Sequence, residues 1–128
     1  DVEIWSVTSF NELDKRGMES ERNEKYFSSN KKPYVSTIFN TPIPTLAVSE
    51  YQRAYANQIR PWATSEYIVL GTDGFGRSDT REKLRDFFEI DANYIALNIL
   101  KSLNKEDEYQ HFMEDNKINL SKKAPWKR

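Results

Sequence analysis

The stretch Tyr67–Phe88 limits the possible folds most, because it joins an apolar run to a glycine-rich loop and then to a helical pattern. The apolar run is Tyr67–Leu70, and the loop after it has glycines at positions 71, 74 and 76. A short apolar run bounded by glycine is typical of a buried strand. Asp79, followed three residues later by Glu82, predicts a capping box at the start of a helix. We therefore expect the strand, loop and helix of an α/β sheet.

The same order of strand, cap and helix occurs twice earlier in the chain. The segments Val2–Thr8 and Thr45–Val48 are predicted strands, the first with apolar residues on both faces as in an interior strand. The predicted helix caps after them are Ser9 with Glu12, and Ser49 with Gln52. Sequential strands joined by helices are normally parallel, with right-handed crossovers in ~98% of cases. The three junctions, near Thr8, Val48 and Leu70, should therefore lie along one edge of the sheet.

Helices account for most of the remaining chain. Residues 11 to about 23 and Tyr34–Phe39 are predicted to be helical, and Asp91 begins a helix with a clear apolar stripe. Residues 107–128 form a loosely patterned tail. A chain of 128 residues is long enough for one core, so residues 1–128 are predicted to form a single domain.

Three blocks of sequence resemble a known family. They are WSVTSFNEL from Trp5, AYANQIRPW from Ala54 and GTDGFGRSDTREKLRDFFEID from Gly71. In this order and spacing they are similar to the transketolase-like C-terminal domain of homodimeric bacterial pyruvate dehydrogenases, the decarboxylating component of the pyruvate dehydrogenase complex. The resemblance implies a three-layer α/β/α sandwich around a mostly parallel, mixed sheet. The family's domain begins with a further strand and helix, so we expect this chain to be truncated at its N-terminus and to be part of a larger polypeptide.

The resemblance also implies an activity. Enzymes of the family use thiamine diphosphate and Mg²⁺ to decarboxylate pyruvate, and they reductively acetylate the lipoyl group of the dihydrolipoyl acetyltransferase component. The family holds its cofactor with a Gly-Asp-Gly motif followed by paired asparagines in another domain, and Thr72-Asp73-Gly74 is only a partial match without that pair. We therefore assign no catalytic, cofactor-binding or metal-binding residue to this chain, and we expect it to be inactive by itself. Its expected role is dimer and interdomain packing, with Phe75 and Arg77 as candidate interface residues.

Composition excludes several other classes of function. The chain has 19 Lys and Arg against 20 Asp and Glu, so it has no overall charge that would attract nucleic acid. It has no apolar run long enough for a membrane span, and its lack of cysteine fits a reducing compartment. We expect a cytoplasmic protein. The single histidine, His111, has no second ligand or carboxylate predicted beside it, so we interpret it as a surface residue.

Two alternatives to the enzyme domain remain open. The loop Gly71–Gly76 precedes a helix, so the chain could be a stand-alone α/β module that binds a nucleotide or another small anion there. However, the glycine spacing is neither that of a dinucleotide fingerprint nor that of a P-loop, and Asp79 would repel an anion. The second alternative is a structural interaction domain that has kept the fold without the enzyme.

Overall fold

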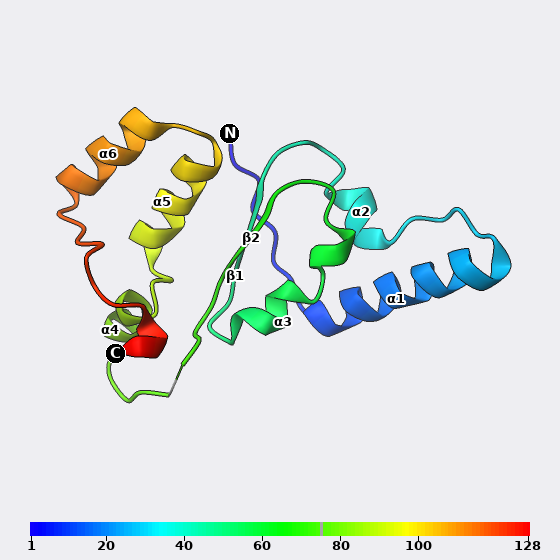
Figure 1. The fold of residues 1–128 in the computed structure, drawn as a ribbon, viewed down its shortest axis with the longest axis horizontal. Coiled ribbons are helices and arrows are strands. Elements are labelled where there is room, and N and C mark those ends of the chain that lie inside the picture. Colours follow the sequence, from blue (N-terminus) through cyan, green and yellow to red (C-terminus); the bar gives the residue numbers. More distant parts are fainter. Residues whose placement is uncertain (75) are drawn as a thin grey trace.

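The computed structural model describes residues 1–74 and 76–128. Helices dominate the described residues, with two short strands between them (Figure 1). In chain order the elements are α1 (Phe10–Phe27), α2 (Tyr34–Ile38), β1 (Thr45–Val48), α3 (Arg53–Asn57), the 3-10 helix η1 (Arg60–Trp62), β2 (Tyr67–Leu70), α4 (Arg81–Phe87), α5 (Ala92–Ser102), α6 (Glu106–Asp115) and the 3-10 helix η2 (Pro125–Lys127).

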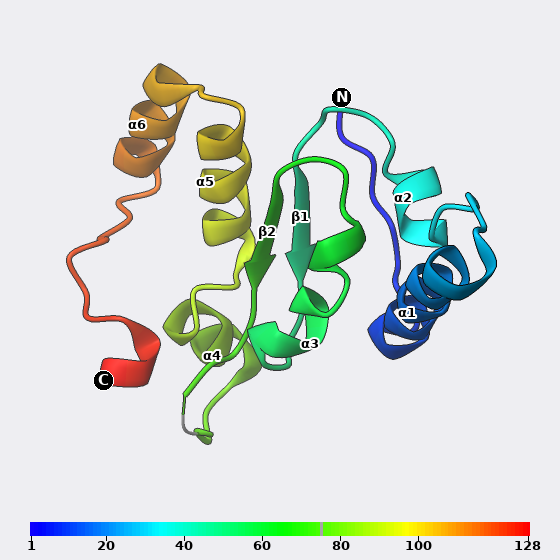
Figure 2. The ribbon, with the colours of Figure 1, turned by 45° about the vertical axis from the view of Figure 1, so that its right-hand side comes forward.

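The two strands form a parallel pair at the centre of the molecule. β1 and β2 pair in register from Thr45 with Tyr67 to Val48 with Leu70, and α3 and η1 connect them. Helices α1 and α2 lie on one side of the strands, and α5 and α6 lie on the other (Figures 1 and 2). The predicted α/β fold is therefore confirmed, as are the bounds of both strands and their parallel direction.

The predicted strand at Val2–Thr8 is wrong. These residues are extended and exposed, and Ile4 keeps 93% of its surface accessible. In Figure 2 the segment lies on the α1 and α2 side of the strands, and Trp5 contacts Phe39 edge to face with ring centroids 5.7 Å apart. The ladder of the described residues nevertheless includes β1 and β2 only. A strand exists only when its backbone groups pair with a neighbour, so an apolar run alone does not make one.

Three of the five predicted helix starts are correct. α2 begins at Tyr34 as predicted. The hydroxyl of Ser9 accepts a hydrogen bond from the Glu12 N–H at 3.2 Å, and α1 continues to Phe27, beyond the predicted end. Asp91 accepts from the Tyr94 N–H at 3.0 Å and caps α5. The Ser9 hydroxyl and the Asp91 carboxylate each bond an N–H group that has no partner within its helix.

The other two helix starts differ from the prediction. The Ser49 hydroxyl accepts from the Tyr51 N–H at 3.0 Å and forms a turn, so it cannot cap α3, which begins only at Arg53. The cap of α4 is Thr80 instead of Asp79, and its hydroxyl accepts from the Lys83 N–H at 3.4 Å. The Asp79 carboxylate instead accepts from the Thr80 N–H at 2.8 Å. Ser49 and Asp79 therefore both bond an N–H group closer along the chain than the predicted one.

The tail contains a helix that the sequence analysis does not predict. α6 covers Glu106–Asp115 and packs antiparallel to α5 after a short connection (Figures 1 and 2). The segment after α6 returns toward α4, where η2 forms (Figure 1).

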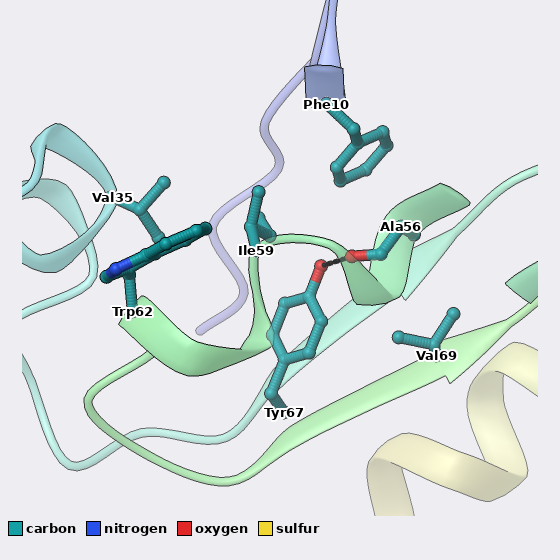
Figure 3. Close-up of a cluster of buried hydrophobic side chains, with 7 residues drawn as sticks. All are labelled: Phe10, Val35, Ala56, Ile59, Trp62, Tyr67 and Val69. Atoms are coloured by element: carbon teal, nitrogen blue, oxygen red, sulfur yellow. Dashed lines mark hydrogen bonds between the residues drawn. The ribbon is translucent and has the colours of Figure 1, made fainter. Parts of the chain in front are cut away.

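The core lies between α1, α2, the α3–η1 connection and β2. Its buried side chains, drawn in Figure 3, are Phe10, Val35, Ala56, Ile59, Trp62, Tyr67 and Val69. The Tyr67 hydroxyl donates a hydrogen bond to the Ala56 carbonyl at 2.8 Å inside this cluster. Burial raises the pKa of Tyr67 to about 12, although the Arg60 guanidinium opposes the shift. Tyr67 is therefore a neutral core residue near neutral pH.

Candidate functional site

The glycine loop is held against the chain that leaves β1. An ideal Cβ at Gly71 would lie 2.6 Å from the Tyr51 carbonyl oxygen and 2.8 Å from the Arg53 nitrogen, so only glycine fits there. The next residue, Thr72, donates its N–H to the Tyr51 carbonyl at 2.8 Å and its hydroxyl to the Glu50 carbonyl at 3.0 Å. The segments that follow the two strands are therefore joined at the carboxyl edge of the sheet.

Asp73 supplies the cap that Ser49 does not. Its Oδ1 accepts from the Arg53 N–H at 3.1 Å at the start of α3, and its Oδ2 pairs with the Arg53 guanidinium. The side chain of Asp73 is only 26% exposed. The cap and the helix are 20 residues apart in the chain, so no local sequence pattern predicts this role. The central residue of Thr72-Asp73-Gly74 is thus a structural group of the loop.

The structure describes only one of the two candidate interface residues, Arg77. Phe75 lies outside the described residues. Arg77 is exposed, but its guanidinium lies 4.1 Å from the centroid of the Phe87 ring and donates to the Arg128 carbonyl at 3.2 Å. Arg77 therefore contacts its own chain at α4 and near residue 128, and part of its hydrogen-bonding capacity is used there.

Two cavities flank the loop. The larger, about 480 Å³, lies beside α4 and is lined by cations of Arg77, Lys83, Lys122 and Arg128 together with Asp79 and Asp86. The smaller, about 200 Å³, lies at the carboxyl end of β2. Its polar walls come from Arg53, Asp73, Glu89, Tyr94 and Asn98, and Trp126 lines it too. Both cavities are lined by positively charged and negatively charged side chains.

The smaller cavity contains one perturbed side chain. Burial raises the pKa of Tyr94, and the negative charges of Glu89, Asp86 and Asp91 raise it further. The Tyr94 hydroxyl is therefore neutral at physiological pH and offers one donor and one acceptor. It can hydrogen-bond a group that enters the cavity, but it is not a base.

His111 lies far from the loop along the chain, on α6. It is exposed, and its Nε2 lies 3.2 Å from Asp115 one turn later, as expected for a surface residue. In the described residues, no three His, Asp or Glu side chains come close enough together to hold a metal ion. No helix among them combines the length and apolar character needed to cross a membrane.

The backbone at Gly74 gives a first testable prediction. Gly74 has φ of 111°, and an ideal Cβ there would approach the Cα of Trp126 to 3.2 Å. Gly74→Ala should therefore destabilise the protein by about 1 kcal/mol, measured by urea denaturation. The matched control is Gly76→Ala in the same loop, where an added Cβ meets no heavy atom within 4 Å. Equal stability of the two variants would contradict a left-handed backbone at Gly74.

Comparison with known proteins finds related sequences across most of the chain. The family model described as "Transketolase-like TK C-terminal domain" matches residues 1–91, which ends just before α5. The Pyruvate dehydrogenase E1 component of Buchnera aphidicola (from Acyrthosiphon pisum) is 48% identical over 135 residues, covering 92% of this chain and 15% of the relative.

Other bacteria have similar sequences with the same name. The Pyruvate dehydrogenase E1 component of Pseudomonas aeruginosa is 46% identical over 106 residues, covering 80% of this chain and 12% of the relative. That of Escherichia coli K12 is 40% identical over 109 residues, covering 83% of this chain and 12% of the relative. This chain thus spans only 12% to 15% of the length of these relatives.

Proposed function

This chain belongs to the transketolase-like C-terminal domain family, and from that premise we propose that it is the C-terminal domain of a pyruvate dehydrogenase E1 component. The family match over residues 1–91 carries the proposal, and relatives at 40% to 48% identity with that name support it. The polypeptide that contains this domain would be a cytoplasmic homodimer. It would decarboxylate pyruvate with thiamine diphosphate and Mg²⁺, and it would reductively acetylate the lipoyl group of the dihydrolipoyl acetyltransferase component.

The partial motif Thr72-Asp73-Gly74 does not fit thiamine diphosphate and its metal ion. Asp73 would have to ligate the metal, but its carboxylate already binds the Arg53 N–H and the Arg53 guanidinium. Thr72 donates its hydroxyl to the Glu50 carbonyl. The cavity beside them has about 200 Å³, below the ~300–1,000 Å³ of typical ligand pockets. We therefore place the cofactor and the chemistry in other parts of the polypeptide.

The proposed task of this domain is packing against other domains and against the second subunit. Residues 71–74 and 76–78 lie at the carboxyl edge of the sheet (Figures 1 and 2). Phe75 and Arg77 are the residues we propose for the contact. Aromatic and Arg side chains are enriched among the residues that dominate interfaces. If a cross-linker at position 77 of the full-length polypeptide reached no other domain or subunit, this role would be ruled out.

Enzyme assays test the proposed function directly. This chain, mixed with thiamine diphosphate, Mg²⁺ and pyruvate, should release no carbon dioxide, and its melting temperature should not change. The full-length polypeptide that contains it should be active under the same conditions. An inactive full-length polypeptide would contradict the assigned enzyme, and activity of this chain alone would contradict the assigned domain role.

The same melting experiment tests the anion-binding alternative. A ligand at a hundred times its dissociation constant stabilises the folded state by roughly 2.7 kcal/mol, which raises the melting temperature by several degrees. A panel of nucleotides and inorganic phosphate should give no such rise. A clear rise with one nucleotide would favour the stand-alone binding module over the enzyme domain.

A further inference from the structure

The segment Lys122–Arg128, named the clasp segment here, returns to the end of α4. The Arg128 guanidinium pairs with Glu89 at 2.5 Å and donates to the Phe87 carbonyl at 3.2 Å. Its side chain is only 17% exposed, so solvent screens this pair less than an ordinary surface ion pair. Arg128 thereby satisfies a carbonyl at the C-terminus of α4 and places a positive charge near the negative end of the helix.

The same segment also contacts the glycine loop. Arg77 donates to the Arg128 carbonyl at 3.2 Å, and both guanidinium groups lie over the Phe87 ring, at 4.1 Å for Arg77 and 5.0 Å for Arg128. The backbone of Trp126 is so close to Gly74 that an added Cβ would lie 3.2 Å from the Trp126 Cα. The clasp segment is therefore in contact with the loop at residues 74 and 77.

A third set of contacts reaches the start of α3. The Arg53 guanidinium lies 5.2 Å from the centroid of the Trp126 ring, and the same Arg53 is held by Asp73 of the loop. Pro125 is buried, and with Trp126 it lines the cavity of about 200 Å³ at the carboxyl end of β2. The clasp segment thus forms one wall of the crevice where α/β folds place their sites.

We propose that Lys122–Arg128 is a clasp that fixes the glycine loop and closes the crevice at the carboxyl edge of the sheet. When the clasp is closed, Arg128 joins the loop to the end of α4, and Trp126 covers Arg53 and Gly74. When it opens, the loop loses these contacts and the crevice opens to solvent. The position of the clasp therefore controls the shape of the surface that the loop presents.

The kind of contact explains why the clasp can open without unfolding the domain. Apart from buried Pro125, it is held by polar contacts and ring stacking at the surface, such as the ion pair of Lys122 with Asp86 at 3.5 Å. The main core is elsewhere, between α1, α2, η1 and β2. Segments with few buried apolar contacts open locally at lower free energy than the core does.

Hydrogen exchange of the whole chain tests the proposal. Arg128→Ala removes the central contact, and Lys127→Ala is the matched control because Lys127 is the exposed neighbour in the same segment. The reporters are the amide of Thr72, bonded to the Tyr51 carbonyl, and the amide of Arg53, bonded to Asp73. We expect Arg128→Ala to speed exchange of both at least tenfold, with α1 and β1 unchanged and Lys127→Ala like the wild type.

Three outcomes would overturn the clasp. Unchanged exchange at Thr72 and Arg53 in Arg128→Ala would show that the loop is fixed without the segment. A uniform increase through α1 and β1 would show a general loss of stability instead of a local opening. Equal effects of Arg128→Ala and Lys127→Ala would show that the assigned contacts are not responsible. A chain ending at Ser121 should repeat the effect of Arg128→Ala, and a wild-type exchange pattern there would also contradict the proposal.

Discussion

Replacing Gly17 with alanine is expected to destabilise the protein by about 3 kcal/mol, at the upper end of the ~1–3 kcal/mol typical of overpacked cores. An ideal Cβ at Gly17 would overlap the ring carbons of Trp62. The ring cannot move aside easily, because Trp62 is 8% exposed and its carbonyl accepts from the Ser36 hydroxyl at 2.6 Å. At an unconstrained helix position, Gly→Ala would stabilise the protein by about 0.5–1 kcal/mol. A loss of stability in Gly17→Ala would therefore indicate a clash with Trp62.

The measurement for Gly17→Ala is urea denaturation followed by tryptophan fluorescence, which also reports on Trp62. Glu19→Ala is the control, since Glu19 is exposed on the same helix and alanine should be tolerated there within about 0.5 kcal/mol. If Gly17→Ala were as stable as the wild type, α1 could not pack on η1 as closely as described.

Truncation of Ile59 is the second substitution with a large expected effect. Ile59 is 1% exposed and lies in the core cluster between Val35, Trp62 and Tyr67 (Figure 3). Ile59→Ala should destabilise by about 3–4 kcal/mol, because it removes buried methyl groups and leaves a cavity that rigid neighbours fill only in part. The denaturation midpoint should fall, and the slope of the transition should stay the same.

The matched control makes the same substitution at an exposed position. Ile4 is 93% exposed, so Ile4→Ala should change the free energy of unfolding by no more than about 0.5 kcal/mol. Similar losses at the two positions would mean that the segment before α1 is buried in solution, contrary to the structure.

Local signals explain which parts of the fold were predictable. Both strands match their apolar runs residue for residue, and Asp91 caps α5 as its side chain and position suggest. α6 had a weak signal in Tyr109, Phe112 and Met113, spaced as one helical face, but the surrounding charges hide it. A strand at Val2–Thr8 could not be decided locally, since it depends on a partner for its backbone groups.

The candidate site was less predictable than the fold. Sequence reasoning selected the glycine loop, but the positive φ of Gly74 within it is a finding of the structure. Sequence reasoning could not predict that Asp73 caps α3 from 20 residues away, or that Arg77 and Arg128 meet across 51 residues. Both contacts depend on the chain returning to the carboxyl edge of the sheet, and spacing in the sequence carries no information about that return.

The parallel pairing of β1 and β2 also determines how the chain can fold in time. Parallel strands cannot be joined by a tight turn, so every rung of this ladder waits until α3 and η1 have folded back between the strands. Closing that loop costs chain entropy before any strand hydrogen bond compensates for it, which slows folding compared with a helical bundle of local contacts. A peptide that contains β1 without β2 would therefore have no partner for its native strand. We expect the crossover around Ile59 to form before the two strands pair.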